Sequence, residues 1–327
     1  MSGLAGHTLY AFLALRQAEE WTPSVVPLLR RHLASYLAGA YIGADIQVMP
    51  EVVCVDTGKE LGFGTVPVTE SPFTGGPVRP WYLEHDGNRY RPSDIHRLFY
   101  GRSHLIFGWA QEMAGLKVPW DSLVRYAACV IRDWEAGGSG RDSGLAWIFG
   151  WLVHVVSDAM IKSRQPGLKM HLVDGLYTPR NRPIQDLFAF HQIGVGELKL
   201  DWESTFDSMA GTPIEEVQFH YMRIRSLGPV LSSAFPEGWA EQYGALLEAV
   251  LRENRRWLRR HAADVLAEMR LEEVSGRRLP SRLLRQWTGE WDYPQIIALA
   301  EQAGIRETLR VISEEIVGLF DHVLAEL

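Results

Sequence analysis

One segment of the chain, residues 144–162, constrains the fold more than any other. Leucine, isoleucine, valine, methionine and tryptophan occur there at most positions, so an α-helix over these residues would be apolar around nearly its whole circumference. A helix of that kind is buried on every side and needs other helices to surround it. The segment therefore predicts a mainly α fold, a multi-helix bundle built around a central helix.

Helical spacing of apolar residues predicts further helices around this segment. They are expected from about His7, then over residues 24–40, 93–114 and 121–135, and again in an amphipathic region after residue 184. The stretch 236–327 is rich in arginine and glutamate and predicts peripheral helices with a solvated face. We expect residues 1–200 to form a helical core that binds metal, with residues 201–327 as a C-terminal helical extension packed on the same domain.

Residues 56–92 differ in amino-acid composition from the rest of the core. Glycines and prolines recur throughout this stretch, so no regular helix can persist there. The insert has room for a β-hairpin that turns at Asp86-Gly87 or at Gly87-Asn88.

Composition limits the class of function. The net charge of -7, from 33 basic and 40 acidic residues, argues against a duplex nucleic acid as partner. The mean hydropathy of -0.10 and the lack of a run of about 18 apolar residues predict no membrane span. The apolar opening lacks the marks of a secretory signal, which predicts a cytoplasmic protein. Cys54 and Cys129 have no partner spacing, so a disulfide framework and a thiolate metal site are both disfavoured. The sequence gives no indication of the oligomeric state.

The central segment contains two polar residues, His154 and Asp158. A separation of four places them on the same face of a helix, one turn apart. A buried carboxylate needs a cation, a hydrogen-bond donor or a metal beside it. Two interpretations stay open: a hydrogen-bonded pair that ties helices together, or two metal ligands from one helix.

Other histidines and aspartates also lie among apolar neighbours. Four of them come from separate segments: His7, Asp45, His104 and His171. Convergence of such residues from several helices is how helical folds build polynuclear metal sites. Nitrogen and oxygen ligands suit zinc, and also iron or manganese.

The order of these pieces resembles the zinc-dependent phospholipase C and nuclease P1/S1 superfamily, in particular its phospholipase C-like bacterial branch. The pieces that carry the resemblance are Gly6-His7-Thr8, AGAYIGADI over residues 38–46, Ser103-His104, GWLVHVVSD over residues 150–158, Gln165-Pro166 and His171. They span roughly the first 190 residues. The resemblance implies the family's helical fold, with His7, Asp45, His104, His154, Asp158 and His171 as ligands of two or three Zn²⁺ ions.

The resemblance also implies an activity, hydrolysis of a small-molecule phosphoester by a metal-bound hydroxide that attacks phosphorus. A carboxylate that is not a ligand would accept the proton of the water, and Asp45 is the first candidate, with Asp56 as the other. His96, Arg102 and Lys162 are candidates for substrate binding. Two other functions stay open: a non-heme di-iron oxygenase built on the same ligand types, and a non-catalytic helical protein that kept the fold.

The chain departs from the family pattern in three places. Ala44 stands where family members usually have proline. The secreted enzymes use a processed N-terminal tryptophan as a metal ligand, and this sequence starts with Met1. No second His-x-x-x-Asp or His-x-x-x-Glu follows His171, so the sequence does not identify the remaining ligands.

Overall fold

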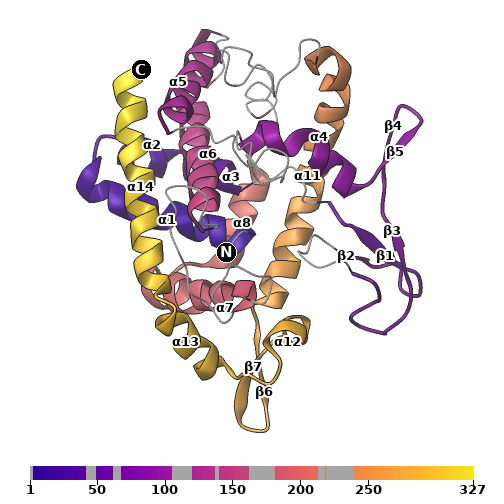
Figure 1. The fold of residues 1–327 in the computed structure, drawn as a ribbon. Coiled ribbons are helices and arrows are strands. Elements are labelled where there is room, and N and C mark those ends of the chain that lie inside the picture. Colours follow the sequence, from indigo (N-terminus) through magenta and orange to yellow (C-terminus); the bar gives the residue numbers. More distant parts are fainter. Residues whose placement is uncertain are drawn as a thin grey trace.

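The computed structural model of the protein describes residues 3–41, 49–61, 68–104, 120–136, 140–161, 181–212, 218 and 239–327. This part of the chain is mainly helical (Figure 1), as the sequence predicts. The helices are α1 (Leu4–Trp21), α2 (Val26–Arg31), α3 (Leu33–Tyr41), α4 (Pro92–His104), α5 (Trp120–Ala136), α6 (Arg141–Ile161), α7 (Asn181–Leu187), the π-helix η2 (Phe188–Glu197), α8 (Trp202–Gly211), α11 (Trp239–Glu268), α12 (Arg282–Thr288), α13 (Tyr293–Gln302) and α14 (Ile305–Glu326).

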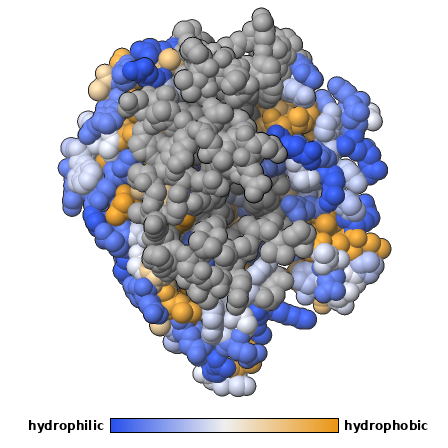
Figure 2. Space-filling model, viewed as in Figure 1, coloured by the Kyte–Doolittle hydropathy of each residue, from blue (hydrophilic) through white to orange (hydrophobic). Residues whose placement is uncertain are grey.

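Helix α6 is the central helix that the sequence predicts. Its residues are buried from Gly144 to Ile161, and α1, α3, α5 and α14 pack around it. Its length and its mean hydropathy of 1.5 would also suit a membrane span, but the whole apolar window is buried inside the protein. In Figure 2 the described part of this face is mostly hydrophilic, with separate hydrophobic patches.

The single helix expected over residues 24–40 is instead two helices. Helix α2 ends at Arg31, the backbone leaves the helical region at His32 with φ -112° and ψ 38°, and α3 begins at Leu33. The two helices differ in their contact with the central helix. Helix α3 packs along α6, whereas α2 makes only a small contact with it.

The helices expected over residues 93–114 and 121–135 correspond to α4 and α5, although residues 105–119 lie outside the described chain. The C-terminal helices are less peripheral than their composition suggests. Ile312, Ile316 and Phe320 of α14 are fully buried, and α14 packs against α1, α5 and α6. The arginines and glutamates occupy only the outer face of this helix, so the expectation of a peripheral helix was wrong for α14.

The insert forms a small β arm. Strands β1 (Val52–Cys54), β2 (Glu60–Leu61) and β3 (Val78–Pro80) make an antiparallel sheet in the order β2-β1-β3. Strands β4 (Leu83–His85) and β5 (Asn88–Tyr90) form the expected hairpin.

The hairpin turns at Asp86-Gly87, where both residues have positive φ values of 47° and 74°. These values match the tight turns that suit the twist of paired strands. Of the two turn positions that the sequence allowed, the structure therefore takes the first.

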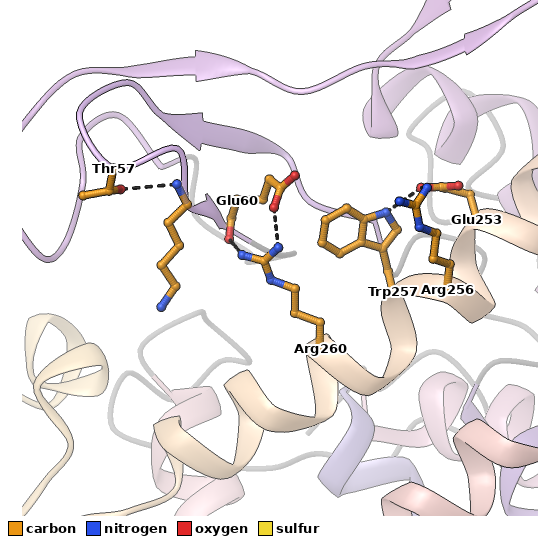
Figure 3. Close-up of polar contacts among 7 residues, drawn as sticks. Thr57, Glu60, Glu253, Arg256, Trp257 and Arg260 are labelled. Atoms are coloured by element: carbon orange, nitrogen blue, oxygen red, sulfur yellow. Dashed lines mark hydrogen bonds and ion pairs between the residues drawn. The ribbon is translucent and has the colours of Figure 1, made fainter.

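The arm is fastened to α11. Arg260 donates to the carboxylate and the backbone carbonyl of Glu60 and lies over the ring of Trp257, as the close-up in Figure 3 shows for the polar contacts. The ring of Trp81 meets Trp257 edge to face at 6.2 Å. A second hairpin, β6 (Leu271–Val274) and β7 (Arg277–Pro280), connects α11 to α12 and was not expected.

Candidate metal centre

Three residues from two helices meet at the middle of the bundle. His7 lies in the first turns of α1, and His154 and Asp158 lie one turn apart on α6. All three are buried, with exposed fractions of 1%, 1% and 2%. Each offers a ligand atom, and these atoms all lie within 4.8 Å of one another. The structure thus brings together one residue from the start of the chain and two from its central helix.

Close contact between α3 and α6 sets the position of His154. A Cβ on Gly150 would lie 1.9 Å from the carbonyl oxygen of Tyr36, and one on Gly39 would lie 2.2 Å from that of Trp147. Only glycine permits this approach. The backbones come near enough for His154 Nδ1 to lie 2.8 Å from the carbonyl oxygen of Ala40.

This hydrogen bond fixes the tautomer of His154. A carbonyl oxygen only accepts, so Nδ1 carries the hydrogen and donates it to Ala40. In the neutral imidazole Nε2 then holds a lone pair. A histidine that donates one ring nitrogen to a backbone carbonyl is the arrangement found in metal-ligating histidines.

Ser157 fixes His7 in the same way. The Ser157 hydroxyl donates its single hydrogen to the carbonyl oxygen of His154 at 3.1 Å. The same oxygen lies 3.3 Å from His7 Nδ1. When the hydroxyl donates to the carbonyl, it accepts from Nδ1, and Nε2 of a neutral His7 then has a lone pair.

That lone pair faces an acceptor. His7 Nε2 lies 3.4 Å from Asp158 Oδ1, and a carboxylate oxygen is also an acceptor. A cation between the two atoms, or a second proton on His7, is needed to make this contact favourable. The rings of His7 and His154 are stacked, with centroids 3.8 Å apart and planes at 11°.

The other candidate residues from the sequence are not members of the described cluster, and some lie outside the described part of the chain. Asp45, Lys162 and His171 lie outside the described residues. Arg102 and His104 belong to α4, but their side chains are not described, and His96 is half-buried on the same helix. Their proposed roles as ligands, base or substrate contacts stay predictions. Asp56 lies on the exposed β arm, where it accepts a hydrogen bond from Thr74.

His191 is not part of the described cluster. It lies in η2, and its Nε2 is 2.7 Å from the carbonyl oxygen of Met269. Burial lowers the pKa of His191 below the usual histidine value, an effect that the nearby Arg278 reinforces and the hydrogen bond to Met269 opposes. The neutral ring donates its Nε2 hydrogen to the carbonyl oxygen of Met269, which is a structural role.

His261 was not among the residues selected from the sequence, yet it is buried and hydrogen-bonded. It lies on α11 with an exposed fraction of 8%, and its Nε2 is 2.8 Å from the hydroxyl oxygen of Tyr41. Leu258 and Val265, three residues before and four after it, are also buried. This helical spacing places His261 on the apolar stripe of α11 and was the signal available in the sequence.

No protein-family model matches this chain, and no curated protein or solved structure matches it. The function must therefore be argued from the site.

Proposed function

We propose that this protein is a metal-dependent hydrolase of a phosphoester, of the phospholipase C/P1 nuclease type, with Zn²⁺ held by His7, His154 and Asp158. The observation that carries the proposal is the pair of acceptors His7 Nε2 and Asp158 Oδ1, 3.4 Å apart in a buried position. The sequence resemblance supports a phosphoester as the substrate, and the nitrogen and oxygen donors of the three residues support a bound metal ion.

The distances fit the metal. Two ligand atoms bound to one tetrahedral Zn²⁺ at about 2.1 Å lie about 3.4 Å apart, which is the separation of His7 Nε2 and Asp158 Oδ1. In six-coordinate octahedral geometry at the same bond length, neighbouring ligand atoms lie only about 3.0 Å apart. The donor pair can therefore share one ion.

The ligand atoms of all three residues lie within 4.8 Å of one another, so His7, His154 and Asp158 would hold an ion together. The sequence resemblance implies two or three such ions.

Bound divalent ions would supply Lewis-acid polarisation of phosphoryl oxygens and a water of lowered pKa. The protein's own residues hold the donors in place. Ala40 and Ser157 contact the Nδ1 atoms of His154 and His7, so the Nε2 atoms are the ones that would bind an ion. Burial in the bundle removes competing water from these donors.

The test is metal analysis of the purified full-length chain, followed by an assay with bis-p-nitrophenyl phosphate. Stoichiometric zinc together with hydrolysis is the expected result. Iron with an optical absorption band would support the di-iron oxygenase instead. A chain without stoichiometric metal would overturn both functions and leave the non-catalytic alternative.

Variants locate the metal. His154→Ala and Asp158→Ala should each lose metal and activity. His322→Ala and Asp321→Ala are matched controls, because both residues are exposed on α14, and these variants should keep the metal content of the wild type. Full metal content in either α6 variant would place the ions elsewhere.

A further inference from the structure

The described chain contains a buried polar contact that the proposed metal ligands leave unexplained. Tyr41 is the last residue of α3, and its hydroxyl oxygen lies 2.8 Å from Nε2 of His261 on α11. The two rings are nearly parallel, with planes at 9° and centroids 5.8 Å apart. This contact connects α11, in the C-terminal half of the chain, to α3, the helix that lies against α6.

Tyr41 also lies against the candidate metal centre. Its ring centroid is 6.3 Å from that of His7, with planes at 36°. The preceding residue, Ala40, accepts the hydrogen bond from Nδ1 of His154. Tyr41 thus lies beside His7 through its ring, and Ala40 binds His154 through its carbonyl oxygen.

Ala40 and Tyr41 each contact a buried histidine of another helix. The carbonyl oxygen of Ala40 contacts His154 on α6, and the hydroxyl group of Tyr41 contacts His261 on α11. A shift of Tyr41 would move the carbonyl of Ala40 with it, because the two residues are adjacent.

We propose that His261, acting through Tyr41, is a positioning residue for the metal centre, one that holds the ring of His7 and the carbonyl partner of His154 in the orientation that binds zinc. The proposal rests on the proposed function, since it requires the His7–His154–Asp158 metal site. Helix α11 has no ligand in the described cluster. The proposal gives this helix a role in metal affinity.

The test compares Zn²⁺ affinity, measured by competition with a chelator, across variants of the full-length chain. Tyr41→Phe keeps the ring and removes the hydroxyl, whereas His261→Leu removes the nitrogen. Each should weaken Zn²⁺ binding by about 10- to 100-fold, the usual effect of losing an outer partner of a metal ligand. The double variant should bind no more weakly than the weaker single variant, because both changes remove the same contact.

Two further variants separate positioning from general loss of stability. His261→Gln places an amide near the position of Nε2 and should restore most of the affinity. Tyr293→Phe is the matched control, because Tyr293 has a similar hydrogen bond from Gln192 at 2.9 Å and is not among the groups around His7; its Zn²⁺ affinity should equal that of the wild type. Circular dichroism melts of the metal-free variants identify any chain that fails to fold.

The Co²⁺ spectrum provides the deciding readout. When saturated with Co²⁺, Tyr41→Phe and His261→Leu should show shifted visible absorption bands, because the ligands are less well oriented. Unchanged spectra and affinities in a wild-type chain that binds Zn²⁺ would overturn this inference alone. A wild-type chain that binds neither ion would overturn the proposed function, and this inference with it.

Discussion

His7 Nε2 and Asp158 Oδ1 face each other at 3.4 Å in the interior of the bundle. Helices α1 and α6 hold the two atoms there. With the Ser157 hydroxyl donating to the carbonyl oxygen of His154 and accepting from His7 Nδ1, a neutral His7 has a lone pair on Nε2. A cation between this lone pair and the carboxylate oxygen makes the contact favourable, and the first two predictions test for such a cation.

Asp158→Asn should separate metal binding from folding. The amide can donate a hydrogen to His7 Nε2, and it also removes a buried charge, so the metal-free variant should be at least as stable as the metal-free wild type. Its Zn²⁺ binding should be lost. Urea unfolding with EDTA and metal analysis measure the two effects. A metal-free variant with a clearly lower urea midpoint would contradict this account of the contact.

Metal removal should destabilise the wild type and leave Asp158→Asn unaffected. An ion that binds only the folded state, at a free concentration 100 times its dissociation constant, adds about 2.7 kcal/mol to the free energy of unfolding. Thermal unfolding scans with added Zn²⁺ and with EDTA should therefore differ for the wild type and coincide for the variant. A Zn²⁺-dependent shift of equal size in both proteins would indicate binding elsewhere.

Gly150→Ala should severely destabilise the protein. The added methyl group would lie 1.9 Å from the carbonyl oxygen of Tyr36, and the contact between α3 and α6 must open to accept it. Overpacking of this kind typically costs about 1–3 kcal/mol, and metal affinity should fall as well because the Ala40 carbonyl moves away from His154. Urea unfolding and chelator competition measure the two losses.

Gly318→Ala is the control for that experiment. Gly318 also lies inside a helix, α14, but a Cβ there meets no atom within 4 Å. Alanine is favoured over glycine in a helix by about 0.5–1 kcal/mol, so this variant should be equally or more stable. If both glycine variants lost the same stability, close packing of α3 on α6 would not be the cause.

His191 should make stability depend on pH. Its pKa is lowered in the folded protein, chiefly by burial, so between the folded value and about 6.5 the unfolded chain binds more protons. Stability should therefore fall as the pH decreases through that window. His191→Gln keeps a donor for the carbonyl of Met269 and does not titrate. The difference in unfolding free energy between wild type and variant should change from pH 7.5 to pH 5, and a constant difference would contradict the prediction.

The sequence by itself determined much of the architecture. The all-round apolar pattern of residues 144–162 required a surrounded helix, and the His154–Asp158 spacing put both side chains on one face of it. The sequence limited the hairpin turn to Asp86-Gly87 or Gly87-Asn88, because the required backbone conformation is local. These features depend on neighbours along the chain, and the structure agrees with them.

Tertiary structure alone decided which distant residues join the site. The pairing of His7 with Asp158, the contacts of Nδ1 in both histidines, and the contact of His261 with Tyr41 all arise from helices that meet only after folding. Composition alone predicted a peripheral position for α14, because the charged residues of its outer face dominate the count and its inner face is buried. Helical periodicity says which face of a segment is apolar, but the partner of that face depends on packing between distant segments, where glycines such as Gly39 and Gly150 set the separation of the helices.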